Sequence, residues 1–252
     1  MRRVGLVVSF LFVFGSAVIG QPVEDRLLAH LANIEKWSNY GNTPNERRLE
    51  SANNGFATDL LRFGRSSEVL SYSFPRLKRK MHVATSADGN FRIYSWDAGT
   101  GGTMHDFSSM FQFRGTSGKV YASSAHVDGF IHDIFQVNSP AGPIYLAVST
   151  SIASGTMNSQ SIKAFKIKGD IVDEHVRVIR TAEGLQNSIS FGYDFGSVMD
   201  RKERPVRLFA FNETDRSFSF PVVIEDEETP QGRVTNKLIT YKFDGEYFVK
   251  VD

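Results

Sequence analysis

Between residues 23 and 63 the apolar side chains recur every three to four positions, which is the spacing of one face of an α-helix. The recurrence is interrupted by the polar stretch Asn39–Glu46 and then resumes. Two stripes result, one formed by Leu27, Leu31 and Ile34 and the other by Leu49, Phe56, Leu60 and Phe63. The pattern predicts two helices joined as a hairpin, followed by a short third segment at 67–75 that ends before a proline.

After Met81 the apolar period changes from about 3.6 to 2, which is typical of strands, and turn residues become frequent. Four short turns separate alternating runs: Asp88-Gly89, Gly169-Asp170, Asn212–Asp215 and Asp244-Gly245. Asp-Gly pairs favour the tight turns whose twist matches that of neighbouring strands. We expect an antiparallel meander of roughly ten to thirteen strands, a number that favours a sandwich, a barrel or propeller-like blades over one open sheet.

The expected fold class is therefore α+β, with an N-terminal helical hairpin packed on or beside a large antiparallel β structure. The chain divides into three segments: residues 1–20, a helical segment at 21–79 and an antiparallel β domain at 80–252. The β domain is expected to be a sandwich or barrel-like, with an irregular propeller as the alternative.

One fragment of the β region, Ser86–Asp97, resembles the strand, turn and Trp-Asp ending of a blade in a WD-repeat propeller. Such propellers repeat a Gly-His and Trp-Asp pattern about every 40 residues. Here the only other tryptophan is Trp37, in the helical segment. The resemblance is confined to this fragment and assigns no family to the chain.

Residues 1–20 have the three parts of a secretory signal peptide. Arg2 and Arg3 form a basic start, an apolar run follows, and Val18 and Gly20 are small enough for the cleavage positions before Gln21. A retained membrane anchor is the alternative, but the apolar core is shorter than the ~20 residues that a spanning helix needs. We expect removal of residues 1–20 and no transmembrane segment in the mature chain.

The composition agrees with export into the periplasm or the medium of a bacterium. The sequence has no cysteine, so no disulfide framework stabilises the exported chain and packing must do so. Removal of residues 1–20, which hold two arginines and no acids, changes the formal net charge from +1 to −1. That balance gives no general attraction to nucleic acid or to anionic membranes.

The glycine-rich stretch Asp97–Asp106 was tested against phosphate-binding patterns. Its glycines do not match the dinucleotide fingerprint, because Met104 occupies the third glycine position and a strand-like segment follows. No Gly-Lys-Ser/Thr ending is present either. We expect a flexible connection between two strands, with a ligand-contacting loop as the alternative, and we predict no cofactor.

The densest polar cluster is His126–Asp133, which contains two histidines and two aspartates. If Asp128-Gly129 is a two-residue hairpin loop, alternation places His126 and Asp133 on one side of the sheet and His132 on the other. The two histidines then cannot bind one ion, and no metal site is predicted. His126 with Asp133, approached by His105 and Asp106 from the preceding loop, is a weak candidate for acid/base catalysis.

Aromatic residues favour a binding role. Pairing about Asp88-Gly89 places Tyr94 and Trp96 on the strand face opposite Phe91 and Ile93. Either both faces are covered, one by the sheet body and the other by the helices, or Tyr94, Trp96 and Asp97 belong to an exposed patch that binds a protein or a sugar.

The leading functional hypothesis is thus an exported, non-catalytic binding protein for a protein or glycan. The alternative is an envelope or secreted hydrolase with its His/Asp site near residues 97–106 and 126–133. The sequence has no Gly-x-Ser-x-Gly elbow, no cysteine nucleophile and no His-Glu-x-x-His. It therefore does not decide whether the protein is an enzyme, and it favours a non-catalytic role.

Overall fold

The computed structural model describes residues 15–227 and 229–251. Its helices are α1 (Gly15–Trp37), α2 (Glu46–Phe63) and α3 (Ser67–Ser71), with short 3₁₀ turns η1 (Leu77–Arg79) and η2 (Phe195–Val198). Its strands are β1 (His82–Thr85), β2 (Phe91–Asp97), β3 (Phe107–Arg114), β4 (Val120–Ala125), β5 (Phe130–Ser139), β6 (Gly142–Ile152), β7 (Met157–Lys168), β8 (Ile171–Asp173), β9 (Ile179–Thr181), β10 (Gly184–Gln186), β11 (Ser188–Asp194), β12 (Ala210–Asn212), β13 (Ser217–Ile224), β14 (Arg233–Phe243) and β15 (Phe248–Val251).

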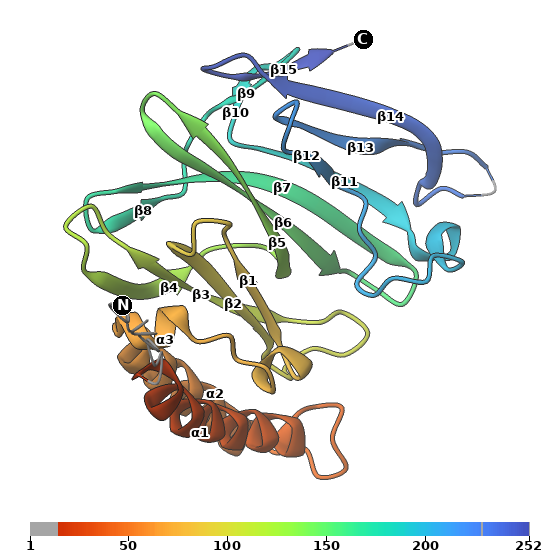
Figure 1. Cartoon of the computed structure of the whole chain (residues 1–252). Helices are drawn as coiled ribbons and strands as arrows, with labels where there is room; N and C mark the ends of the chain where they lie inside the picture. The colour runs from red at the N-terminus through yellow and green to blue at the C-terminus, as the bar shows by residue number, and fades with distance from the viewer. Residues whose placement is uncertain (1–14, 228, 252) are drawn as a thin grey trace, which may run out of the picture.

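The strands form three mostly antiparallel sheets that lie in successive layers, with the helices as a fourth layer on one side (Figure 1). The proximal sheet, next to the helices, has the order β1-β2-β3-β4. The middle sheet has the order β11-β7-β6-β5, with β8 also paired to β7. The distal sheet has the order β10-β9-β15-β14-β13-β12. The α+β class and the sandwich alternative are confirmed, and none of the three sheets closes into a barrel.

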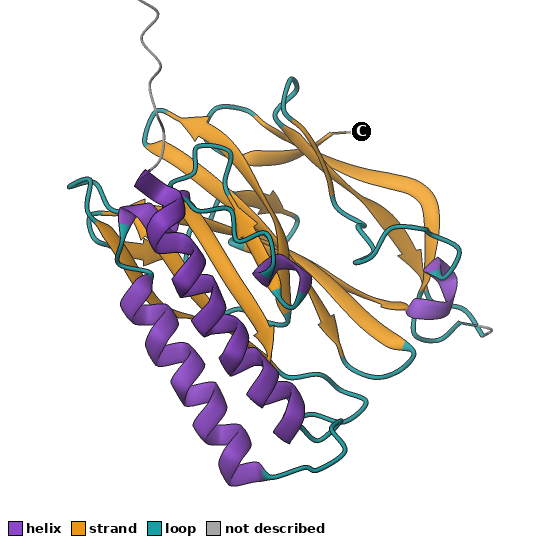
Figure 2. Ribbon diagram, turned by 60° about the horizontal axis from the view of Figure 1, so that its bottom comes forward, coloured by secondary structure: helices purple, strands orange, loops and turns teal. Residues whose placement is uncertain are grey.

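The predicted helical hairpin and third segment are present as α1, α2 and α3. Asn45 caps α2 because its side chain accepts a hydrogen bond from the backbone N–H of Arg48. Figure 2 shows α1 and α2 side by side across one face of the strands. The four predicted turns also join paired strands, β1 to β2, β7 to β8, β12 to β13 and β14 to β15.

Each interface between layers has its own apolar core. The helices pack on the proximal sheet through side chains such as Leu27, Phe56 and Trp96. The proximal and middle sheets enclose a second core, which includes Phe91, Phe111 and Phe165. The middle and distal sheets enclose a third, which includes Leu146, Ile162, Phe218 and Phe248. The sequence predicted a boundary between the helical segment and the β domain at residue 80. The core under the helices crosses this boundary, because it includes Met81 as well as residues of the helical segment.

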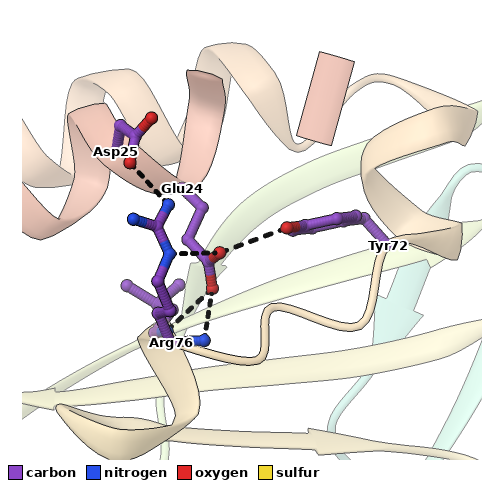
Figure 3. Close-up of polar contacts among 5 residues, drawn as sticks. Glu24, Asp25, Tyr72 and Arg76 are labelled. Carbon is purple, nitrogen blue, oxygen red and sulfur yellow. Dashed lines mark hydrogen bonds and ion pairs between the residues drawn. The ribbon is translucent and has the colours of Figure 1, made fainter. Parts of the chain in front are cut away.

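A buried carboxylate in the N-terminal half of α1 fixes that helix against the chain that leads into β1 (Figure 3). Glu24 is fully buried, and its Oε1 accepts the backbone N–H groups of Arg76 and Leu77 at 2.8 Å. Its Oε2 accepts the Tyr72 hydroxyl and Arg76 Nε, both at 3.2 Å. Burial acts to raise the pKa of Glu24, but these hydrogen bonds to the charged form outweigh it and lower the pKa.

The predicted signal segment falls mainly on residues 1–14, which lie outside the described residues. Within the described ranges, no helix is both long enough and apolar enough to cross a membrane.

Candidate functional site

The beginning of the glycine-rich loop at 98–106 is hydrogen-bonded to two other parts of the chain. Asn39, in the connection between α1 and α2, donates its backbone N–H to Gly99 O at 2.8 Å and its side-chain amide to Thr100 O at 2.6 Å. Asn53 of α2 donates to Ala98 O at 2.8 Å. These bonds attach residues 98–100 of the loop to the helical hairpin.

The loop brings two of the predicted site residues into direct contact. His105 Nδ1 lies 2.6 Å from Asp97 Oδ2, and both side chains are about one-third exposed, at 35% and 31%. The Tyr40 ring lies tilted against the His105 ring, with 5.0 Å between their centroids. Burial, followed by the charges of Asp97 and Asp106, raises the pKa of the Tyr40 hydroxyl to about 12. Asp106 itself accepts a hydrogen bond from the Thr100 hydroxyl at 2.9 Å.

Asp97 also lines a groove of about 800 Å³ between the end of α1, the loop that follows it and η1. We call this the hairpin groove. Its charged side chains are Glu35, Lys36, Arg79, Lys80 and Asp97. Two of its carboxylates already have partners, since Glu35 pairs with Lys80 at 3.3 Å and Asp97 with His105.

The second predicted cluster does not form the hairpin that the sequence suggested. β4 pairs with β3 in the proximal sheet and β5 pairs with β6 in the middle sheet, so residues 126–129 carry the chain from one sheet to the other. A bulge then interrupts β5 between Ile131 and Asp133. The alternation argument fails for both reasons, because it required β4 and β5 to pair without a bulge.

The cluster is therefore divided between two surroundings. His126 is 88% exposed and lies 3.6 Å from Glu174. Asp133 instead contacts His132 Nδ1 at 2.9 Å and Arg207 Nε at 3.1 Å. The structure thus pairs His105 with Asp97 and places His126 and Asp133 with partners of their own, so the four weak catalytic candidates do not share one pocket.

The predicted aromatic binding residues lie in the core. Tyr94 is fully buried and Trp96 is 4% exposed, and both pack beneath the helices. The Trp96 indole N–H donates to Asn53 Oδ1 at 3.0 Å, and the Tyr94 hydroxyl donates to Gln112 Oε1 at 2.7 Å. Of the three predicted ligand-binding residues, Asp97 lines a groove and the other two do not. The face of β2 that carries Tyr94 and Trp96 is covered by the helices.

A second groove, of about 460 Å³, lies over the middle sheet beyond the part that the proximal sheet covers. Residues 126–128 form one wall, and His126 and Asp128 are among the lining residues. Its floor consists of β6, β7 and β11 and carries six serines: Ser149, Ser151, Ser159, Ser161, Ser188 and Ser190. We call it the serine groove.

The six serines share one face because the strands pair in register. Ser149 is opposite Ser161, which is opposite Ser190, and Ser151 is opposite Ser159. Ser149 is only 6% exposed and is one of the residues that line the groove.

Sequence reasoning missed this site although a signal was present. Three strands each carry a Ser-x-Ser pair, at 149–151, 159–161 and 188–190. Period-2 alternation places both serines of a pair on one face. Only the strand pairing reveals that the three pairs lie side by side.

Comparison with protein-family models, with curated proteins and with solved structures found no match. Among residues 15–227 and 229–251, no group of three or more histidine, aspartate or glutamate side chains is arranged to hold a metal ion.

Proposed function

We propose that the protein is an exported, non-catalytic binding protein that holds a glycan in the serine groove. The observation that carries the proposal is the floor of six serines, which the pairing of β6, β7 and β11 places on one face of the sheet inside the groove. Sugars present hydroxyl groups that both donate and accept, as serine hydroxyls do. A floor of serines therefore matches the polar surface of a sugar.

A glycan suits this groove better than a protein partner. Protein interfaces depend on large apolar or aromatic side chains that fill pockets. The floor of the serine groove has small polar side chains, and its lining includes only a few apolar residues, such as Val127 and Ile131. The charged groups at one end compensate one another, since Glu174 lies within 3.4 Å of Lys163 Nζ and 3.6 Å of His126 Nδ1.

Export is supported by the features of α1 as well as by the composition. Pro22 lies inside α1, where a proline is disfavoured, but it would stand in the first turn of a helix that begins near Gln21. Glu24 and Asp25 would then also lie in the first turn, where acidic side chains complement the helix dipole. The mass of the mature chain recovered from the envelope or the medium should correspond to a first residue of Gln21.

The Asp97–His105 pair is the observation that favours the second candidate, a hydrolase. An aspartate that accepts the Nδ1 proton of a histidine leaves Nε2 free to act as a base. However, Ser38, the serine that lines the hairpin groove, already donates its hydroxyl to Glu35 O at 2.9 Å. Binding therefore remains the better supported proposal.

The test is binding of the purified mature chain to an array of immobilised neutral and acidic glycans. We expect capture of at least one neutral glycan, and about tenfold weaker capture by Ser149→Ala, because one net hydrogen bond is lost. Ser124, an exposed serine of β4 outside both grooves, provides the matched control, and Ser124→Ala should bind like the wild type.

Two outcomes would contradict the proposal. Failure to bind any glycan on the array would remove the ligand class. Release of shortened sugars from a bound glycan, abolished by His105→Gln, would favour the hydrolase instead.

A further inference from the structure

A buried arginine of β2 lies against the chain that runs from α3 to η1. Arg92 is only 4% exposed, and its Nη1 donates to the backbone carbonyl of Val69 at 3.1 Å and to the Tyr94 hydroxyl at 3.2 Å. Its Nε donates to the Thr85 hydroxyl at 2.9 Å. All three acceptors are neutral, so they satisfy donors of the guanidinium and leave its positive charge uncompensated.

The charge of Arg92 is permanent, because a guanidinium does not lose its proton in a protein. A buried charge is normally paired with a charge of the opposite sign. Within residues 15–227 and 229–251, none of the ion pairs includes Arg92. The fold therefore holds a buried cation to which the described part of the chain supplies no carboxylate.

A second cation, Lys78 of η1, is brought to the same place by Phe74. The Phe74 ring contacts the guanidinium, with 5.6 Å between its centroid and Arg92 Cζ. The backbone carbonyl of Phe74 accepts the backbone N–H of Lys78 at 3.1 Å. Burial, followed by the charge of Arg92, lowers the pKa of Lys78. The two positive charges are thus close enough to act on each other.

Other basic side chains of the same segment do have acidic partners, and these lie on α1. Arg76 Nε pairs with Glu24 at 3.2 Å. Lys80 pairs with Glu35 at 3.3 Å. Lys78 has no such partner in the part of the chain that the structure describes, and no carboxylate is among the groups that shift its pKa. It is therefore free to act together with Arg92 on an anion from outside the chain.

One edge of the Arg92 guanidinium is accessible from solvent. Its Nη2 makes no hydrogen bond within the described residues, where the bonds of Arg92 start from Nε and Nη1. Nη2 is also not one of the enclosed polar atoms that lack a partner, so it reaches the surface. Lys78 is exposed and has a flexible stem, which lets its Nζ approach the same opening.

The charge of this pair indicates the class of anion. Chloride or a single carboxylate would neutralise only one of the two cations. A phosphate group carries about −1.5 to −2 charges at pH 7, which matches both. Its several oxygens can accept hydrogen bonds from an arginine and from a lysine at the same time, and both side chains are common phosphate ligands.

We propose that Arg92 and Lys78 form a binding site for a phosphate dianion, either inorganic phosphate or the phosphate group of a small monoester. Arg92 Nη2 and Lys78 Nζ donate to its oxygens. The site lies on the side of the proximal sheet that the helices cover, because Arg92 contacts Val69 of α3. It is separate from the serine groove over the middle sheet and does not depend on the proposed glycan binding.

The experiment is a calorimetric titration of the purified protein with inorganic phosphate near neutral pH, with the ionic strength held constant by chloride. We expect saturable binding to one site. Lys78→Gln should weaken it by about tenfold, because one charge-assisted hydrogen bond is lost. Lys78 is exposed, so this substitution should leave the fold intact.

The matched control is Lys237→Gln, which removes the same charge from an exposed position on β14 in the distal sheet. This variant should bind phosphate like the wild type. Phosphate should also raise the Tm of the wild type and of Lys237→Gln more than that of Lys78→Gln, since a ligand that binds the folded state stabilises it.

A titration with glycerol phosphate separates the two sources of the anion. Tighter binding than that of inorganic phosphate would assign the site to a monoester, and weaker binding would assign it to the free ion. Glycerol itself should not bind.

Three results would overturn the proposal: no saturable binding of either phosphate, equal affinities for the wild type and Lys78→Gln, or equal affinities for Lys78→Gln and Lys237→Gln. Each would mean that Arg92 serves the fold alone. Capture on the glycan array reports on the serine groove and is expected to be the same for Lys78→Gln and the wild type, so the two proposals fail independently.

Discussion

Gly101 and Gly102 are neighbours in the loop at 98–106, yet the structure assigns them opposite tolerance for a side chain. A Cβ atom at Gly101 would lie 2.0 Å from the backbone carbonyl oxygen of Met104, a distance that requires the loop to move. A Cβ atom at Gly102 would have no heavy atom within 4 Å. The difference arises from the path of the loop and not from anything in the local sequence.

We therefore expect Gly101→Ala to lower the free energy of unfolding by about 1–3 kcal/mol, as overpacked sites do. Gly102→Ala should leave it unchanged or raise it by about 0.4–1 kcal/mol, because alanine restricts the unfolded chain. Urea denaturation of both variants measures the contrast. Equal stabilities for the two would show that the loop adapts freely and does not form a fixed wall of the hairpin groove.

At the scale of elements, the position of α1 depends on one carboxylate. Glu24 joins the N-terminal half of α1 to the backbone N–H groups of Arg76 and Leu77, from which the chain leads through η1 into β1. The basic run at 76–80 therefore begins with a residue that helps to fix the helix. Arg76 contacts both Glu24 and Asp25 of α1.

Glu24→Gln should lower the free energy of unfolding by about 2–4 kcal/mol, because an amide cannot accept all four hydrogen bonds and leaves buried donors unpaired. Asp25→Asn is the matched control. Asp25 contacts the same arginine but is 55% exposed, and its loss should cost at most about 1 kcal/mol. Chemical denaturation at neutral pH checks both values, and similar losses for the two variants would contradict the anchoring role of Glu24.

At the scale of the whole molecule, a pair of histidines lies where the proximal and middle sheets meet. His82 of β1 stacks on Phe130 of β5 at 3.9 Å between ring centroids. Burial, followed by the charge of His132, lowers the pKa of His82 from 6.5 to about 4. His132 Nε2 is also buried and has no partner among the described residues, although Nδ1 contacts Asp133, which in turn contacts Arg207.

This depressed pKa predicts a loss of stability in acid. As the pH falls below about 6.5 the unfolded chain takes up a proton at His82, whereas the folded chain does so only near pH 4. Stability from this group is thus complete above pH 6.5 and declines between 6.5 and 4, by up to about 1.4 kcal/mol per pH unit.

The measurement is the free energy of unfolding at pH 7, 6 and 5. His82→Phe, which keeps a ring against Phe130, should lose less stability than the wild type over this range. His175 is exposed and serves as the control, so His175→Phe should follow the wild type. A wild type and His82→Phe with the same pH dependence would show that His82 is not the group responsible.

The sequence by itself determined the elements that depend on local periodicity. The helical hairpin follows from the 3.6-residue stripes, and the tight turns that join β1 to β2 and β14 to β15 follow from their Asp-Gly pairs. Alternation was also sufficient to place Tyr94 and Trp96 on one face of β2 and Phe91 and Ile93 on the other. The sequence also contained the Ser-x-Ser pairs and the Asp97 and His105 residues that flank one loop.

Only the tertiary structure decided which strands share a sheet and which faces are covered. A pattern of period 2 specifies two faces for each strand but no partner, so Asp128-Gly129 looked like a hairpin turn although the chain changes sheets there. Burial of Tyr94 and Trp96 required the helices to lie over them, and the array of serines required β6, β7 and β11 to pair in register. These relationships join residues far apart in the chain, and the contacts that determine them form only when the layers pack together.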